Sequence, residues 1–461
     1  MDTHNNKKHP KGLYLLFTIE MWERFSYYGM RGILMLYLTK SLFEGGLAFG
    51  VKTASLIYGF YTGFVYFTPL IGGWLADRYL GQRKAINIGA FTMMVGQIVL
   101  FAANSRAGLY SGLILLIAGN GFFKPNISTL VGKLYKDNDP KRDSAFSIFY
   151  MGVNLGAFLA PLIIGLLSDN IFADRNEAGE IISYGYRYGF LAAGTGMFIG
   201  QTVFIALAKK YLGNLGLEPA GSGKILAKTR EKTAPEKLTS IEKQRIGVIF
   251  IFFLFAIFFW AGFEQAGSSL TLYADNYIER SLNLPVVGQY IIPTAWFQSV
   301  GPLFIVLLAP LFSMFWVSKR GRNVPVPIKM GTGMVILGAG FFFMLAAVAQ
   351  RGGDIDDVNI KASLWWLVLT YFVHTVGELC LSPVGLSVVT KLSPPKFASL
   401  LMAVWFLSSF FANILAGWLA SYVETLGAGK IFLYISVFVI TCGLALIALN
   451  KIILKMMHGV R

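Results

Sequence analysis

Charged side chains lie inside apolar segments of this sequence, where they could bind protons, each other or a charged ligand. The set comprises four carboxylates and three cations: Glu20, Glu23, Arg24, Arg31, Lys124, Glu264 and Glu378. A charge at the centre of a lipid bilayer costs roughly 2.5–3.5 kcal/mol on insertion scales, so we expect these residues to have a function or an internal partner. Four anions against three cations leave one charge over, which one bound proton would balance.

Four of these charges share one face of the first apolar segment. At about 100° per residue, Glu20, Glu23, Arg24 and Arg31 fall with Tyr27 on a helical face about 100° wide. Glu20 and Arg24 are i,i+4 neighbours that can pair. We expect this face to line a water-filled cavity, because it cannot face lipid. The alternative is that the charges form ion pairs that only hold the helices together, above all Glu20 with Arg24.

The elements that must position these residues are membrane helices. Hydrophobic residues make up 55% of the 461 residues and charged residues 14%, whereas soluble domains average roughly 25% charged residues. This composition excludes a disordered protein, a disulfide-built secreted module and an ordinary cytosolic enzyme. A membrane helix needs roughly 20 mostly apolar residues. Twelve segments qualify, approximately 13–40, 52–76, 85–104, 108–132, 144–170, 186–208, 246–276, 286–317, 327–349, 363–390, 397–423 and 430–456.

The sequence therefore predicts an all-α membrane protein with 12 transmembrane helices, and its basic residues predict the orientation. Of the 40 Lys and Arg residues, 28 fall in the termini and the even-numbered loops. The positive-inside rule then places both termini in the cytoplasm. The net charge of +16 faces anionic lipid in this interpretation and needs no nucleic acid. No cleavage site follows the N-terminal stretch, so we expect the first segment to be a retained helix.

The longest polar stretch divides the chain into two halves. We expect a six-helix bundle over 1–208, a cytoplasmic linker over 209–245 with a short amphipathic helix near 236–245, and a second six-helix bundle over 246–461. Each half has a short basic loop after its second helix, which is a weak internal repeat. Duplicated halves are typical of transporters whose substrate site lies at the membrane midplane between them.

Several other kinds of site have no support in the sequence. No phosphate-binding GxxxxGK[ST] loop, metal-ligand cluster or hydrolase triad occurs. We therefore expect no enzyme activity, no metal and no cofactor, with an ion gradient as the driving force. His374 stands four residues before Glu378 and can either hydrogen-bond to it or serve in packing.

A family resemblance emerges from the same residues. Residues 20–29 match the pattern ExxERFxYYG of the proton-dependent oligopeptide transporters, a family of the major facilitator superfamily. Residues 72–81 and 146–158 resemble further signatures of that family, and similar stretches in the second half surround Glu264, Gln298, Glu378, Ser382 and Trp405. The resemblance covers essentially the whole chain. It implies a proton-coupled symporter that imports di- and tripeptides across the plasma (inner) membrane by alternating access.

The resemblance also implies roles for individual residues. Proton coupling would fall to Glu20, Glu23, Arg24 and Glu264. Arg24 and Lys124 would face the peptide carboxylate, and Glu378, helped by Asn154, the peptide ammonium. The remaining pocket residues would be Tyr27, Tyr28, Tyr66, Trp260, Ser382, Trp405 and Phe406. The salt bridges of the gates would join Arg31 with Glu264 and Lys124 with Glu378.

The chain also departs from the family pattern. The linker is too polar to supply the two extra helices of many bacterial members. Gly301 stands where many members have Asn, so one contact to the ammonium is in question. Helix 2 lacks the coupling His of animal relatives, so carboxylates must couple the proton. The short loop over 350–362 favours a microbial source. We expect a monomer that uses the proton as its coupling ion and has peptides, protons and lipid as partners.

Two other functions remain open from the sequence. A nitrate or other small-anion symporter could use the same scaffold, but it would have no use for Glu378. A non-transporting peptide sensor would usually carry a large soluble domain or a long tail, and neither is evident.

Overall fold

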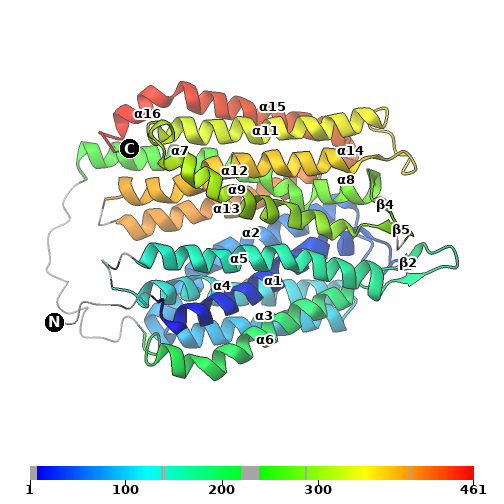
Figure 1. The fold of residues 1–461 in the computed structure, drawn as a ribbon, viewed down its shortest axis with the longest axis horizontal. Helices are drawn as coiled ribbons and strands as arrows, with labels where there is room; N and C mark the ends of the chain where they lie inside the picture. Colours follow the sequence, from blue (N-terminus) through cyan, green and yellow to red (C-terminus); the bar gives the residue numbers. More distant parts are fainter. Residues whose placement is uncertain are drawn as a thin grey trace. The chain divides into compact units, whose positions relative to one another are not determined.

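Each of the twelve predicted segments contains a long helix in the computed structural model, which describes residues 8–136, 139, 141–219, 238–285, 288–394 and 397–460 (Figure 1). The helices of the first half are α1 (Lys11–Thr39), α2 (Val51–Leu75), α3 (Gln82–Ala102), α4 (Arg106–Lys133), α5 (Lys141–Leu166) and α6 (Tyr186–Leu212). Short π-helices extend α2 and α5, namely η1 (Ala76–Leu80) and η2 (Leu167–Ile171). The predicted bounds agree with these to within a few residues.

The helices of the second half are more interrupted. The predicted helix over 246–276 is broken into α7 (Ser240–Phe263), the 3-10 helix η5 (Glu264–Gly267) and α8 (Ser269–Tyr277). The others are α9 (Val300–Val317), α10 (Lys319–Arg322), α11 (Val326–Gln350), α12 (Leu364–Leu392), α13 (Ala398–Ala420), α14 (Val423–Leu426), α15 (Ala428–Ala448) and α16 (Asn450–Met456).

The predicted helix over 286–317 is wrong at its start. Residues Gly288–Ile291 form strand β5, which pairs antiparallel with β4 (Ser281–Leu284). The 3-10 helix η6 (Thr294–Ser299) follows before α9 begins. Pro293 explains the late start, because the residue before a proline favours an extended conformation. Two further short pairs join β1 (Asp174–Arg175) to β2 (Ile181–Ser183), and β3 (Ile278–Glu279) in parallel to β6 (Ala362–Ser363).

Eleven helical segments of the described residues are long and apolar enough to cross a membrane. Helix α1 has 29 residues, which is also long enough, but it carries several charged side chains. With α1 the segments make up the twelve predicted membrane helices, so the prediction of an all-α membrane protein is confirmed. The charged side chains of α1 are unusual for a membrane helix, and they call for a functional or structural explanation.

The chain divides into two compact units. Unit 1 consists of Met1–Ile33, Phe43–Leu47 and Phe67–Thr233, and unit 2 of Leu34–Leu42, Ala48–Tyr66 and Ala234–Arg461. The boundary near residue 234 falls in the predicted linker, whose residues 220–237 lie outside the described part. The units differ from the predicted halves in one respect: the end of α1 and most of α2 belong to unit 2.

Close helix packing explains why most of α2 belongs to unit 2. A Cβ atom on Gly59 of α2 would lie only 2.8 Å from Cα of Gly417 on α13. The Phe64 and Phe410 rings of the same two helices meet edge to face at 5.3 Å. Small residues allow membrane helices to approach closely and so gain van der Waals contact. Glycine at both positions therefore joins α2 to α13.

The two ends of the linker differ in structure. Helix α6 continues to Leu212, inside the stretch predicted as linker. The short amphipathic helix predicted near 236–245 is instead the beginning of α7. Thr239 caps α7 by accepting a hydrogen bond from the Glu242 backbone N–H, and the Glu242 side chain bonds back to the N–H of Thr239. This capping box fixes where α7 starts.

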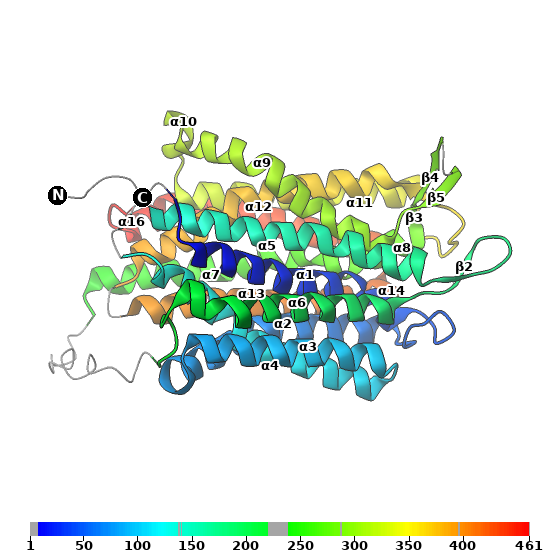
Figure 2. The same cartoon turned by 60° about the horizontal axis from the view of Figure 1, so that its bottom comes forward.

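Helix α9 packs on one side only. It contacts α12, and Figure 2 shows α9 and α10 along the margin of unit 2. No residue of α9 is fully buried, and its exposed side chains include Leu307, Leu311 and Met314. An apolar helix surface of this kind suits contact with lipid.

Candidate functional site

The charged face of α1 is buried in unit 1. Glu20, Glu23 and Arg24 are each at most 4% exposed. Nε of Arg24 lies 3.2 Å from Oε1 of Glu20, and the same nitrogen also forms an ion pair with Glu23. Asn120 of α4 donates a hydrogen bond from Nδ2 to Oε1 of Glu23 at 3.0 Å. The predicted pairing of Glu20 with Arg24 is confirmed, and one guanidinium serves two carboxylates.

Glycines place α1 against its neighbours. A Cβ atom on Gly156 of α5 would lie 2.4 Å from the backbone oxygen of Met21, and one on Gly152 would lie 2.9 Å from the Phe17 ring. On the α6 side, Gly196 leaves room for the Phe25 ring in the same way. The charged turn of α1 is therefore held at backbone contact distance, which fixes the position of Arg24.

Further predicted residues of unit 1 surround Arg24. Its guanidinium carbon lies 5.4 Å from the centre of the Tyr27 ring, and Tyr27 meets Tyr28 edge to face at 5.1 Å. Lys124 of α4 is partly buried and lies within electrostatic range of Glu20. Two cations and two tyrosines thus accompany the two carboxylates. Such a cluster can take up a proton on a carboxylate or bind an external carboxylate at the cations.

Two other predicted residues, Arg31 and Asn154, are buried within unit 1. Arg31 is buried, seven residues after Arg24 on α1. Asn154 of α5 is buried as well and donates from Nδ2 to the backbone oxygen of Tyr150 at 3.0 Å, one turn earlier. The Asn154 amide oxygen keeps its capacity to accept a hydrogen bond.

The break between α7 and α8 positions Glu264 in unit 2. Glu264 is the first residue of η5 and is buried. Three side chains donate to the backbone oxygen of Ala266 within the break: Gln298 at 2.7 Å, the Thr271 hydroxyl at 2.8 Å and the Tyr371 hydroxyl at 3.3 Å. Gln265 donates to the backbone oxygen of Ala416 on α13 at 3.1 Å. The bonds to Ala266 satisfy a backbone group that the interrupted helix leaves open, and the Gln265 bond joins the break to α13.

Glu378 of α12 is a buried carboxylate with one oxygen that has no hydrogen-bond partner among the described residues. Its side chain is 8% exposed, and Oε2 is enclosed without a hydrogen bond among the described residues. Glu264 lies within electrostatic range of it. An isolated buried carboxylate is costly unless a cation or a proton joins it. Unit 2 therefore offers a site for a cationic group at Glu378.

The predicted pocket residues of unit 2 differ in their surroundings. Gly385 of α12 makes room for Trp405, because a Cβ atom there would lie 2.3 Å from Cζ2 of the indole. Trp260 is partly buried and meets the Phe263 ring edge to face at 5.3 Å. Ser382 and Tyr66 are also partly buried, whereas Phe406 is 48% exposed. Trp405 is thus fixed by packing, and Phe406 is not.

The two predicted gate pairs stay predictions. Each would join a residue of unit 1 to a residue of unit 2: Arg31 to Glu264, and Lys124 to Glu378. The roles assigned to the other site residues likewise stay predictions.

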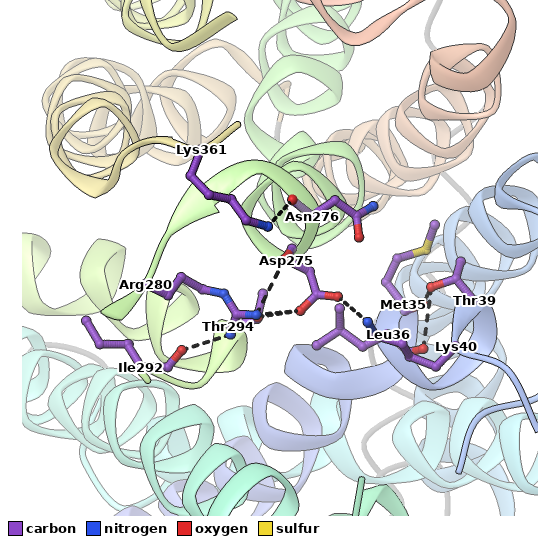
Figure 3. Close-up of polar contacts among 10 residues, drawn as sticks. All are labelled: Met35, Leu36, Thr39, Lys40, Asp275, Asn276, Arg280, Ile292, Thr294 and Lys361. Atoms are coloured by element: carbon purple, nitrogen blue, oxygen red, sulfur yellow. Dashed lines mark hydrogen bonds and ion pairs between the residues drawn. The ribbon is translucent and has the colours of Figure 1, made fainter. Parts of the chain in front are cut away.

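A polar network that the sequence analysis missed surrounds Asp275, near the end of α8 (Figure 3). The Asp275 carboxylate pairs with Nζ of Lys40 at 2.8 Å and with Arg280 at 3.1 Å. It also accepts a hydrogen bond from the Thr294 hydroxyl at 2.8 Å. Lys361 donates to the backbone oxygen of Asn276 beside it. The end of α1 is thereby tied to α8 within unit 2.

One signal for this network was available in the sequence. Asp275 falls in the last turn of a predicted apolar segment, as Lys40 does at the end of the first. Charges at segment ends are usually solvated, so their pairing could not be inferred.

Two ionisable groups near this network lie outside the membrane-spanning helices. Burial lowers the pKa of Lys361, and hydrogen bonds from Ser281 lower the pKa of Glu279.

Among the described residues, no group of three or more His, Cys, Asp or Glu side chains could hold a metal ion. The candidate site consists of charged and aromatic side chains: a cluster of carboxylates, cations and tyrosines in unit 1, and the carboxylates Glu264 and Glu378 in unit 2.

Known proteins are similar to nearly the whole of this chain. Residues 83–214 and 220–434 match the model of a family described as the POT family. The chain is 33% identical to the peptide transporter YePEPT of Yersinia enterocolitica, covering 98% of this chain and 96% of that protein. It is 31% identical to the di-/tripeptide transporter of Lactococcus lactis subsp. cremoris, covering 98% and 97%. A crystal structure of the peptide transporter POT in complex with sulfate has a TM-score of 0.86 at 34% identity, covering 99% of this chain and 97% of that one.

Proposed function

Since this chain belongs to the POT family, we propose that it is a proton-coupled symporter that imports di- and tripeptides by alternating access. It is a multi-pass membrane transporter. The observation that carries the choice of substrate is Glu378, a buried carboxylate whose enclosed oxygen has no partner in the described residues. A peptide is a zwitterion with an ammonium at one end, and that ammonium is the cation that Glu378 lacks.

The carboxylate end of the peptide needs cations, and the cluster of unit 1 supplies them. In this proposal Arg24 and Lys124 bind the peptide carboxylate, and Glu378 with Asn154 binds the ammonium. Fixing both termini while leaving the side chains loosely held favours short peptides of varied sequence. The aromatic and polar residues that shape the pocket are Tyr27, Tyr28, Tyr66, Trp260, Ser382, Trp405 and Phe406.

Proton coupling rests on the carboxylates that share cations. Because Arg24 holds both Glu20 and Glu23, protonation of either one frees part of the guanidinium for the peptide. Protonation of Glu264 would likewise release Arg31, and Lys124 with Glu378 would form the opposite gate. A bound proton changes which pairs are stable, and so it favours one state of the transporter over another. The proton is the coupling ion in this scheme, and no other cofactor takes part.

Other parts of the proposal concern where and how the protein works. It resides in the plasma (inner) membrane with both termini in the cytoplasm, as the basic loops favour. It acts as a monomer and catalyses no chemical reaction.

A small-anion symporter is the second candidate within transport. The arginine and lysine of unit 1 could bind nitrate, and this is what favours it. A nitrate site would, however, leave Glu378 as an uncompensated buried charge. A non-transporting sensor has no observation in its favour.

The deciding experiment measures uptake of labelled dialanine into proteoliposomes with an imposed inward proton gradient. We expect uptake to rise with the gradient, to be inhibited by unlabelled tripeptides and to be unaffected by nitrate. Liposomes without protein and liposomes without a gradient serve as controls. If nitrate but no peptide accumulated with the gradient, the anion symporter would replace this proposal.

A further inference from the structure

A second unpaired polar side chain lies next to Glu378. His374 of α12 is 1% exposed, and neither of its ring nitrogens has a hydrogen-bond partner among the described residues. The Leu337 carbonyl of α11 lies toward the ring but falls outside hydrogen-bond geometry. A buried polar group without a partner is destabilising, so each one in a native structure calls for an explanation.

The surroundings of His374 are built to accept an imidazole ring. On α11, a Cβ atom at Gly340 would lie 2.5 Å from Cδ2 and 2.8 Å from Nε2 of the ring. The Phe341 ring lies 4.7 Å away and the Phe263 ring 6.5 Å away, centre to centre. Two phenylalanines and a glycine form an apolar wall around the ring, and none of these three residues has a side chain that can accept or donate a conventional hydrogen bond.

The geometry of α12 relates His374 to Glu378. Residues four apart on a helix are surface neighbours, and helical side chains lean toward the N-terminus. The Glu378 side chain therefore leans toward the turn that carries His374. Of its two oxygens, Oε2 is the enclosed one without a partner, which leaves Oε1 as the oxygen that a ligand can reach.

No strong cation competes for this place within the three helices around it. The Lys and Arg residues of α7, α11 and α12 all lie near helix ends: Lys243, Arg245, Lys329 and Lys391. The other charged group close by is Glu264, which directly follows Phe263 and repels a second carboxylate. His374 is therefore the side chain of α12 placed to donate a hydrogen bond to the enclosed oxygen of Glu378.

We propose that His374 is a positioning residue for substrate binding: its ring N–H donates to Oε2 of Glu378, directly or through a water, so that Oε1 faces the substrate ammonium. Pairing the two groups removes two unsatisfied buried polar groups at once. The same bond also fixes the orientation of the carboxyl group, which determines where Oε1 lies for the substrate. This inference rests on the proposed function, since it assumes that Glu378 binds an ammonium.

The test compares two substitutions of similar shape. His374→Gln keeps a side-chain donor, whereas His374→Met removes it. The dissociation constants of dialanine and N-acetyl-dialanine are measured by calorimetry on purified protein, for the wild type, both variants and the same variants carrying Glu378→Gln. Thr370→Val is the matched control, because Thr370 is buried one turn earlier on α12 and bonds to the Gly340 backbone oxygen. Thermal unfolding of each variant shows that it is folded.

We expect His374→Met to weaken dialanine binding roughly five- to thirtyfold, which lies within the range of coupling between neighbouring polar residues. His374→Gln should restore most of the affinity, and N-acetyl-dialanine should bind all of these proteins alike. In the Glu378→Gln background, His374→Met should have no further effect. Thr370→Val should leave the preference for the free amino group unchanged.

Two results would overturn the inference. One is equal weakening of both ligands by His374→Met, and the other is the same weakening with and without the Glu378 carboxylate. Either would make His374 a packing residue. A wild-type protein that binds neither ligand, or binds both equally, would instead contradict the proposed role of Glu378, so the two failures are distinguishable. If His374→Met did not fold, His374→Leu and His374→Gln would carry the same comparison.

Discussion

Arg24 holds two buried carboxylates with one guanidinium, and this shapes what a substitution there can do. The planar fork presents several N–H donors in fixed directions, so it can bond to Glu20 and Glu23 and still offer donors to a ligand. A lysine ammonium is a compact point charge without that fork. Charge alone therefore does not define the role of this residue.

Arg24→Lys should strongly impair proton-driven uptake of dialanine, because lysine keeps the charge but cannot span both carboxylates and the peptide. Losing a charge-assisted hydrogen bond typically costs about 1.5–3 kcal/mol, which corresponds to roughly ten- to a hundredfold in binding. Uptake is measured in proteoliposomes with matched protein content. Arg187→Lys is the control, since Arg187 is exposed and its guanidinium lies against the Tyr188 ring. Near-normal uptake by Arg24→Lys would reduce Arg24 to a simple charge partner.

Elements meet at glycines throughout this fold, and the contact of α1 with α5 decides where the charged face lies. Gly152 and Gly156 stand one turn apart on α5 against Phe17 and Met21 of α1. At Gly156 the nearest atom is the Met21 backbone oxygen, so no side-chain rotation can relieve an added methyl group there.

Gly156→Ala should therefore destabilise the protein by about 1–3 kcal/mol, the usual range for overpacking. The added Cβ would lie 2.4 Å from the Met21 oxygen, and α1 must shift away from α5. Thermal unfolding in detergent measures the loss. Gly50→Ala is the matched control, because a Cβ atom there meets nothing within 4 Å. Equal melting temperatures for the two variants would show that the contact of α1 with α5 tolerates a methyl group.

The network at the end of α8 acts at the same scale, since it ties three elements of unit 2 together. Asp275 is shared by Lys40 from the end of α1, Arg280 from the loop after β3 and Thr294 from η6. One carboxylate thus fixes the end of α1 to α8.

Asp275→Asn should destabilise the protein by about 3 kcal/mol, because removing one partner of a buried ion pair leaves the other charges uncompensated. The variant is compared with Glu279→Gln, which alters an exposed carboxylate of the same loop that bonds to Ser281. Surface changes of that kind usually stay within about 0.5 kcal/mol. Thermal unfolding at low and high salt measures both variants. No difference between them would mean that solvent compensates Lys40 and Arg280.

The coupling of proton binding to peptide transport involves the whole molecule, because a proton bound at one residue must change how the transporter moves. Glu264 begins the break between α7 and α8, where backbone groups are held by Gln298 and Tyr371. A broken helix held by a few hydrogen bonds can respond to a change of charge more readily than a continuous one.

Glu264→Gln should separate transport from coupling. Glutamine imitates the neutral, protonated carboxyl and cannot respond to a gradient, and a switch needs different free energies in its two states. Counterflow of dialanine without a gradient should survive at least in part, whereas proton-driven accumulation should fail. Both are measured in the same vesicles, with the exposed Glu180→Gln as control.

Loss of both activities in folded Glu264→Gln protein would make Glu264 a structural or binding residue. Retention of both would leave coupling to Glu20 and Glu23 alone.

Local patterns in the sequence were enough to predict the membrane helices and one contact of the candidate site. Twenty or more apolar residues in a row predict a membrane helix because lipid cannot solvate an open backbone. The pairing of Glu20 with Arg24 followed from the spacing of four, which helix geometry alone determines. The motif over residues 20–29 indicated the family for the same reason: its residues are neighbours in the chain.

Contacts between distant parts of the chain were decided only by the tertiary structure. Lys40 and Asp275 are 235 positions apart, and no periodicity relates them. The same holds for Gly59 and Gly417, whose backbone contact assigns most of α2 to unit 2. The sequence also could not show that the His374 ring and Oε2 of Glu378 have no hydrogen-bond partner in the described part of the chain, because an unpaired group is defined by everything packed around it. Hydropathy and spacing describe one helix at a time, whereas these features depend on which side chains a second helix brings near.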